Sequence, residues 1–313
     1  MNRLPPHPAR DARATRDVLL FANPNAGRGA ARRIAEKITD RLGTRGYRVH
    51  TLFSPPGSFE SDAGQGAPAA AISIGGDGTL RAVAERLGQI YPRDRVPPLV
   101  VVPMGTANLM GTHLDHRWKR QDIGREIADA LDRRQVAYLD AGRANGQLFL
   151  LMASAGFDAG VVHEMERVRT GPIEFYSYAL PTALTLKDYA YPPITVTVDG
   201  RHVFGPAPGH AIIANVPEYG VGFPFLPKAR PDDELLDVCV LPCRSRAALI
   251  KIVLRAAVGE HLQDEGAVFA SGRSIRIDPV DADVPVQLDG DAFGTAPLQI
   301  DLLPHHVPFI VPR

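Results

Sequence analysis

A glycine-rich loop between an apolar run and a helical pattern constrains this chain most. The apolar run at 69–74 indicates a buried strand, and Gly75–Thr79 follows it with almost no side-chain bulk. Apolar residues from Leu80 to Leu87 then recur at helical spacing. A strand, a glycine loop and a helix in this order place free N–H groups and the positive end of a helix dipole at one sheet edge. The loop therefore predicts a seat for a phosphate group.

Asp77 is an acidic residue in a loop that should attract anions. Its carboxylate is suited to holding a metal ion, or to accepting a hydrogen bond from a hydroxyl group. The alternative is a tight turn in which Asp77 caps the helix that follows. Asp77 is therefore a candidate catalytic residue, and the capping role stays open.

The first half of the chain alternates strand and helix patterns. Strands are predicted at 18–22, 47–53, 69–74 and 99–102, and a helix face runs from Ala31 to Leu42. This alternation predicts a parallel, doubly wound sheet. The loops that follow its strands should meet at the edge where such sheets bind ligands.

Two further loops with small and polar residues follow strands. Their candidate nucleotide-binding residues are Asn23, Pro24, Asn25, Ala26 and Gly27 in one loop, and Gly105, Thr106 and Asn108 in the other. Taken singly, each loop also fits an ordinary helix start, with Asn25 or Thr106 as the cap. Three such loops at successive strand ends favour a binding site.

The second half of the chain has a different pattern. Asn-Gly at 145–146 and Asp-Gly at 199–200 separate apolar runs, which is a strong hairpin signal. Further short strands are predicted at 211–214, 235–241, 275–277, 284–288 and 298–302. This spacing predicts an antiparallel sandwich, interrupted by helical segments near 173–187 and 247–261.

The sequence thus predicts two domains. Residues 17–138 should form the α/β domain and 139–303 the sandwich, with the boundary between Val136 and Gly142. We expect a disordered tail at 1–16, and the C-terminal segment 304–313 can pack back on the first domain.

Composition narrows the possible functions. Lys plus Arg and Asp plus Glu both total 35, so the formal net charge is zero and a generally basic nucleic-acid binder is excluded. No apolar run approaches the roughly 20 residues of a spanning helix. Cys239 and Cys243 are too few for a zinc site and fit reduced thiols of a cytosolic protein. A cytoplasmic location, with any membrane contact at the surface, is therefore expected.

Two acidic segments could carry chemistry. Asp232, Asp233 and Glu234 precede a strand and could hold Mg²⁺ or Ca²⁺ with nearby carbonyl groups, although composition alone favours a solvated turn. Asp289 and Asp291 flank a glycine at a strand end. One could act as a general base and the other as a metal ligand or orienting group. The alternative is a plain Asp-Gly hairpin turn.

Together these motifs resemble the soluble diacylglycerol kinase catalytic-domain family, which includes diacylglycerol, sphingosine and ceramide kinases and bacterial lipid kinases. The loops at 23–27, 75–79 and 103–108 are similar to its three nucleotide-site motifs in order and spacing. The similarity to its junction and second-domain motifs lies at 140–149, 155–159, 227–233 and 288–290.

The resemblance implies an ATP- and Mg²⁺-dependent phosphotransferase. It implies ATP in a cleft between the domains, and γ-phosphate transfer to a lipid hydroxyl such as that of diacylglycerol. Residues 23–27, 75–79 and Thr106 would bind nucleotide, and Ser54 stands where the family often has a nucleotide-contacting threonine. The lipid acceptor implies peripheral contact with the inner face of the membrane, and a homodimer is left open.

The resemblance also assigns the acidic segments. Asp233, with the carbonyl groups of Arg230 and Leu235, would form a structural Mg²⁺ site. Asp289 and Asp291 would form the catalytic pair, one of them accepting a proton. The chain departs from the family pattern at two positions. Asp291 replaces a glutamate, which shortens the side chain, and Glu234 replaces a glycine, which can alter the turn.

Two other functions stay open. NAD kinases share the loop at 75–79 and the two-domain plan, but their usual Asn-Glu pair is replaced here by the 105–108 segment. The departures at Asp291 and Glu234 also fit a catalytically weak nucleotide-binding regulator.

Overall fold

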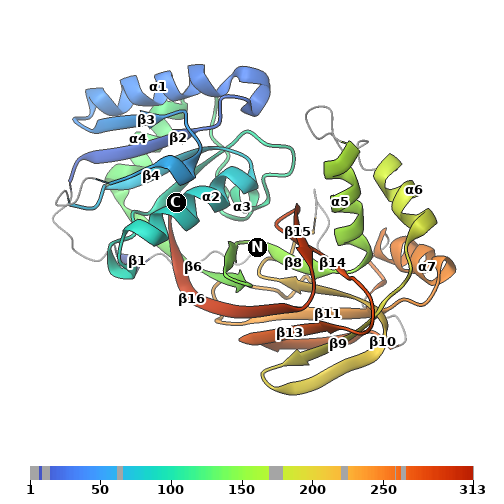
Figure 1. Cartoon of the computed structure of the whole chain (residues 1–313). Helices are drawn as coiled ribbons and strands as arrows, with labels where there is room; N and C mark the ends of the chain where they lie inside the picture. The colour runs from blue at the N-terminus through green and yellow to red at the C-terminus, as the bar shows by residue number, and fades with distance from the viewer. Residues whose placement is uncertain are drawn as a thin grey trace. The chain divides into compact units, whose positions relative to one another are not determined.

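The computed structural model divides into two compact units (Figure 1). It describes residues 7–8, 15–61, 66–168, 179–219, 225–257, 259–261 and 266–312. Unit 1 comprises Met1–Leu139 with His305–Arg313, and unit 2 comprises Asp140–Pro304. Most of the tail for which disorder is predicted lies outside the described residues.

Unit 1 is built on a parallel sheet in the order β3, β2, β4, β5, β16. Its strands are β2 (Asp17–Ala22), β3 (Arg48–Leu52), β4 (Ala70–Gly75) and β5 (Leu99–Pro103), with the end of β16 (Leu298–Ile310). β1 (His7–Pro8) pairs antiparallel with β6 (Gln135–Ala144). All six residues of β4 are buried, as expected for a strand covered on both faces.

Helices cover both faces of this sheet. They are α1 (Ala31–Thr44), α2 (Asp77–Ile90), α3 (Leu109–His113) and α4 (Ile123–Arg133). Ile34, Ile38 and Leu42 of α1 pack in one core cluster with α4 and with one face of the strands, and α2 lies across the sheet (Figure 1). The predicted doubly wound domain is therefore confirmed.

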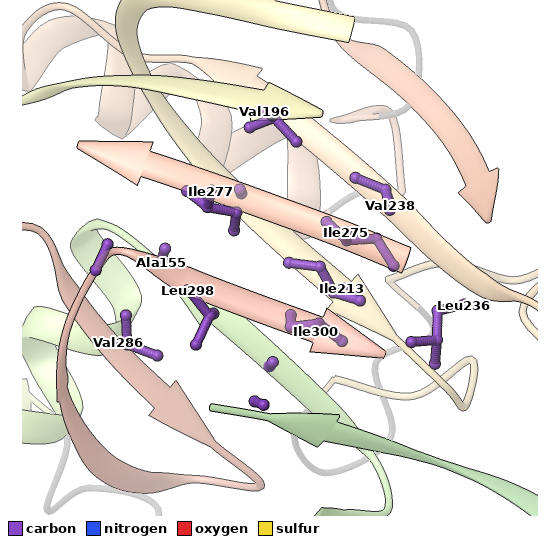
Figure 2. Packing of buried hydrophobic residues seen from close by; sticks show 14 of the residues in the cluster. Ala155, Val196, Ile213, Leu236, Val238, Ile275, Ile277, Val286, Leu298 and Ile300 are labelled. Carbon is purple, nitrogen blue, oxygen red and sulfur yellow. The ribbon is translucent and has the colours of Figure 1, made fainter. Parts of the chain in front are cut away.

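Unit 2 is an antiparallel sandwich. Its strands are the end of β6, β7 (Gln147–Phe149), β8 (Met152–Ala155), β9 (Pro193–Val198), β10 (Arg201–Ala214), β11 (Leu236–Pro242), β12 (Val268–Gly272), β13 (Ser274–Pro279), β14 (Pro285–Leu288), β15 (Asp291–Thr295) and most of β16. One layer contains β9, β13 and β16, and the other contains β8, β11 and β14. Figure 2 shows the core between the layers, where Val196, Ile275 and Ile300 face Ile213 and Val238.

Three helices pack on one layer of the sandwich: the first lies against β8, β14 and β15, the second lies on the first, and the third shares a core cluster with β10 and β11. They are α5 (Phe157–Val168), α6 (Ala179–Asp188) and α7 (Arg246–Ala257). Phe157, Leu249 and Ile252 share a core cluster with Cys239 and Leu241 of β11. Cys239 and Cys243 are both free thiols, as the sequence predicts.

Several predicted elements need correction. The strand predicted at 211–214 is the end of β10, because register shifts near Phe204 absorb the Gly205–Pro208 segment that interrupts the apolar pattern. The last predicted strand continues from Leu298 to Ile310. Helix α5 was not predicted, and residues 173–178 of the segment predicted as helical lie outside the described part.

A buried histidine ties the C-terminal strand to unit 1. Nδ1 of His116 accepts a hydrogen bond from the Val101 N–H (3.1 Å), so its Nε2 donates to the Ile310 carbonyl oxygen (2.7 Å). Burial lowers the pKa of His116 from 6.5 to about 4. Its neutral ring therefore belongs to the folded state.

This histidine should make the stability of unit 1 depend on pH. In the unfolded chain His116 takes up a proton around pH 6.5, whereas in the folded chain it does so only near pH 4. The stability of the folded state should therefore fall as the pH drops from 6.5 to 4. The expected loss is on the order of 3 kcal/mol. Fluorescence of Trp118, whose ring lies 5.2 Å from that of His116, measures it during urea unfolding.

Two variants distinguish the contribution of His116 to this pH dependence from the contributions of other titrating groups. His116→Gln should be less stable at pH 7 but lose less stability between pH 6.5 and 4. His202→Gln replaces an exposed imidazole and should keep the pH dependence of the unchanged chain. Equal pH dependence in all three proteins would contradict the assignment to His116.

Candidate active site

Main-chain hydrogen bonds join the three predicted loops of unit 1. The Asn23 N–H donates to the Ile74 carbonyl (3.0 Å), and the Met104 N–H donates to the Gly75 carbonyl (2.8 Å). The Gly27 N–H then donates to the Met104 carbonyl (3.2 Å). The carboxyl ends of β2, β4 and β5 thus carry one continuous loop cluster.

Two glycines allow the second and third loops to touch. A Cβ atom at Gly105 would lie 2.6 Å from the Gly76 Cα, and one at Gly76 would lie 3.2 Å from the Gly105 Cα. The first distance leaves no room for a side chain at Gly105, whereas a side chain at Gly76 would need the facing main chain to shift by a few tenths of an ångström. Backbone packing therefore requires a glycine at 105 and favours one at 76.

Asp77 links the same two loops through its carboxylate. It accepts hydrogen bonds from the N–H groups of Leu109 (3.0 Å) and Met110 (3.2 Å) at the start of α3. Burial raises the pKa of the Asp77 carboxyl, and these N–H groups oppose the rise. Gly76 is the N-cap of α2, so the alternative in which Asp77 caps its own helix is wrong. The carboxylate instead holds the third loop in place.

Several polar side chains of the cluster are used within their own loops. Oδ1 of Asn23 accepts the Asn25 N–H (3.0 Å). Asn108, at φ 51°, bonds Gly105 twice, accepting its N–H (2.7 Å) and donating to its carbonyl (2.6 Å). These contacts fix the shapes of the first and third loops.

The remaining predicted residues lie on the same loops or beside them. Thr106 is exposed at the tip of the third loop, and Ser54 is exposed beyond the end of β3. Pro24 lies in the first loop, but Ala26 and Gly27 begin a short 3-10 helix (Ala26–Gly29) that was predicted as loop. Gly78 and Thr79 lie in the first turn of α2 rather than in the loop. A 14-residue helix that begins beside two glycines offers N–H groups and a positive dipole end to an anion.

In unit 2, Asp289 occupies the turn between β14 and β15. Its backbone is left-handed (φ 52°), and its carboxylate accepts the N–H groups of Leu150 (2.9 Å), Leu151 (2.8 Å) and Met152 (3.0 Å). Three N–H donors stabilise negative charge and fix the orientation of the carboxylate. Asp291 is exposed at the start of β15.

A series of hydrogen bonds between polar groups supports the turn that holds Asp289. The sequence analysis did not identify these polar groups. The Gly290 N–H donates to Gln287 Oε1 (2.8 Å), and Gln287 Nε2 donates to Ser154 Oγ (3.0 Å). Ser154 in turn donates to Asp158 (2.5 Å), which also accepts the Tyr219 hydroxyl. Gln287 and Ser154 are nearly fully buried polar residues in otherwise apolar strands, and this was the signal available in the sequence.

The acidic segment at 230–235 forms a tight loop. Oδ1 of Asp233 accepts the Leu235 N–H (3.1 Å), and Oδ2 of the buried Asp140 accepts the Glu234 N–H (2.8 Å). Glu234 adopts φ 60° and pairs with Arg273. The turn that a glycine would form is therefore kept, at the cost of a left-handed non-glycine residue.

The electrostatics of this loop suit a cation. Burial raises the pKa of the Asp233 carboxyl, and the neighbouring Asp237 and Asp140 raise it further, while the Leu235 N–H and Arg230 oppose the rise. No group of three or more His, Cys, Asp or Glu side chains suited to a metal occurs among the described residues. A metal here would therefore need carbonyl oxygens, such as those of Arg230 and Leu235, beside the carboxylate.

This chain combines an α/β domain, which carries the cluster of glycine loops, with an antiparallel sandwich. Solved two-domain kinases share this fold. A solved diacylglycerol kinase from Bacillus anthracis str. Sterne matches with a TM-score of 0.68 at 24% identity, covering 95% of this chain and 97% of that one. An NAD kinase from Archaeoglobus fulgidus in complex with ATP matches with a TM-score of 0.51 at 13% identity, covering 94% and 92%. Both similarities establish the fold.

Sequence comparison places the chain within this class. Residues 17–144 match the diacylglycerol kinase catalytic domain, and 152–311 match the YegS C-terminal NAD kinase beta sandwich-like domain. A diacylglycerol kinase of Bacillus subtilis (strain 168) is 24% identical over 305 residues, covering 94% of this chain and 96% of the relative. The chain belongs to the diacylglycerol kinase-like lipid kinase family, which confirms the resemblance seen in its motifs.

Proposed function

We propose that this chain is an ATP-dependent lipid kinase that transfers the γ-phosphate of ATP to a hydroxyl group of diacylglycerol or a related lipid alcohol. The observation that carries the proposal is the loop cluster, in which Gly76 and Gly105 touch and Asp77 holds the third loop. Main-chain N–H groups beside a helix start are suited to binding phosphates. Family membership supplies the reaction class.

Each domain has its own role in the proposed reaction. Residues 17–138 bind nucleotide through the 23–27, 75–79 and 105–108 loops, with Ser54 beside them. Residues 139–303 provide the lipid-substrate domain. Asp289 accepts the proton of the lipid hydroxyl, because three main-chain N–H groups hold its carboxylate in one orientation, and Asp291 assists it.

Mg²⁺ fits the proposal at two places. ATP is used with Mg²⁺, which neutralises phosphate charge during phosphoryl transfer. Asp233, with the carbonyl groups of Arg230 and Leu235, would hold a second ion. Oxygen donors suit a hard cation, and burial, with the nearby Asp237 and Asp140, raises the pKa of the Asp233 carboxyl, a strain that a cation would relieve. The lipid acceptor also requires transient contact with a membrane, and none of the helices in the described ranges is long and apolar enough to span one.

The second ion should stabilise unit 2. Because Mg²⁺ would relieve repulsion among Asp233, Asp237 and Asp140, saturating Mg²⁺ should raise the unfolding temperature by about 2–4 °C. Asp233→Asn should abolish this increase, as measured by differential scanning calorimetry without nucleotide. Asp283→Asn, an exposed control in the same unit, should keep it. An equal increase in both variants would contradict binding at Asp233.

The proposed reaction is tested with radiolabelled ATP, Mg²⁺ and a total lipid extract in mixed micelles, followed by separation of labelled lipids. A labelled lipid that is absent with the Asp289→Asn variant would support the proposal and identify the acceptor. Labelling of NAD instead would favour an NAD kinase. ATP binding with no labelled product would favour a regulatory protein.

A further inference from the structure

The outer face of α7 exposes three large aliphatic side chains. Ile250 is 47% exposed, Val253 55% and Leu254 64%. Their spacing of three and four residues places them on neighbouring turns of one helix surface. Aliphatic side chains grouped in this way on an exposed helix face mark an interaction surface more often than isolated ones do.

The helix that carries them is anchored on its other face. Leu249 and Ile252 are buried in the core cluster beneath the helix. The Arg246 guanidinium donates to the Lys187 carbonyl at the end of α6, whose Leu180 is 60% exposed. Figure 1 shows α6 and α7 together beside the sandwich strands of unit 2. The exposed residues thus project from a helix whose inner face is fixed.

The helix carries basic residues and no acidic ones, and the first acidic residue after it is Glu260. The segment 244–259 contains four basic residues and no Asp or Glu, although the whole chain has a formal net charge of zero. The basic residues are Arg244, Arg246, Lys251 and Arg255. Lys251 and Arg255 are four residues apart and therefore lie along the same side of the helix. Aliphatic residues flanked by cations are the composition of helices that lie in the interface of anionic membranes.

We propose that the outer face of α7 docks on the surface of an anionic lipid bilayer, with Ile250, Val253 and Leu254 entering the headgroup boundary and the exposed Arg244 and Lys251 facing lipid phosphates. A second copy of the chain is a poorer occupant, because two such helices packed face to face would bring like charges together. The physiological use of this contact, delivery of the enzyme to its lipid substrate, rests on the proposed function. The contact itself does not.

Flotation with lipid vesicles tests the docking without ATP or turnover. The full chain should bind vesicles of equal parts phosphatidylcholine and phosphatidylglycerol more tightly than vesicles of phosphatidylcholine, and added salt should weaken the binding. Val253→Gln/Leu254→Gln should bind the mixed vesicles at least about ten-fold more weakly. Arg244→Gln/Lys251→Gln should lose the preference for the anionic lipid. Because all four side chains are exposed, both variants should keep the melting temperature of the unchanged chain.

The matched control removes the same charge elsewhere. Arg33→Gln/Lys37→Gln changes two exposed cations of α1, a helix without large exposed aliphatic residues in the described structure, and should bind vesicles normally. Equal binding by the α7 variants and the control would overturn the proposal. A dimer in sedimentation that becomes monomeric only in Val253→Gln/Leu254→Gln would also overturn it, because the face would then bind a second copy. Phosphorylation of a dispersed short-chain lipid tests the kinase proposal separately.

Discussion

Asp289→Asn should reduce lipid phosphorylation by about 10²–10⁴-fold, the range expected when a positioned general base is lost. The substitution keeps the shape of the side chain and its left-handed backbone, which asparagine tolerates. The amide nitrogen cannot accept a proton and must face at least one of the N–H groups of Leu150, Leu151 and Met152. We therefore also expect unit 2 to lose about 1–3 kcal/mol of stability.

The two effects of Asp289→Asn are separable because the chain contains a matched aspartate. Asp281 is also left-handed (φ 53°) but is exposed, so Asp281→Asn should change neither stability nor activity. Steady-state kinetics at a temperature well below the melting point of Asp289→Asn measures activity of the folded enzyme. If folded Asp289→Asn retains nearly full activity, Asp289 shapes the turn and another group accepts the proton.

The α/β domain could be predicted well because its signals are local. Small glycine-containing loops follow short apolar runs, and helical periodicity resumes after them, so strand, loop and helix are each specified within about a dozen residues. The convergence of the loops at 23–27, 75–79 and 103–108 then follows from the parallel direction of their strands. The prediction missed α4 and read the 3-10 helix Ala26–Gly29 as loop. It also placed the start of α2 too late, because Asp77 and Thr79 fit a loop and the first turn of a helix equally well.

The sandwich was less predictable because its strands are defined by distant partners. The Gly205–Pro208 segment has the composition of a loop, yet β10 runs through it by shifting register against β9. Pro304 and His305 similarly suggest an end, whereas β16 continues and pairs with β5 about 200 residues earlier in the chain. Only tertiary packing decides such cases.

Within the candidate site, the sequence identified the carboxylates but not their partners. Asp77 and Asp289 were both singled out by the glycines around them. The N–H groups that donate hydrogen bonds to these two carboxylates belong to residues 32 or more positions away in the chain. No local sequence pattern therefore reveals that the main chain holds both carboxylates. The support of the second turn by Gln287 and Ser154 was hidden for the same reason.

Gly105→Ala should abolish ATP binding, because the contact between the second and third loops has no space for a methyl group. The new Cβ would lie 2.6 Å from the Gly76 Cα and 3.0 Å from Asn108 Oδ1, and main-chain atoms cannot move aside as a flexible side chain can. The loops must separate, which displaces the N–H groups proposed to bind phosphate and costs about 1–3 kcal/mol of stability. Isothermal titration calorimetry with Mg²⁺ and ATP measures the binding.

The control for this prediction is Gly43→Ala in α1, where no atom lies within 4 Å of the added methyl group. Alanine favours helix, so this variant should gain up to about 1 kcal/mol of stability and bind ATP normally. Melting curves of both variants show whether each is folded during the titration. Normal ATP binding by a folded Gly105→Ala variant would mean that the close approach of Gly76 and Gly105 serves the packing of unit 1 and that the nucleotide is bound elsewhere. Loss of binding in Gly105→Ala alone would tie nucleotide binding to this contact between two glycines.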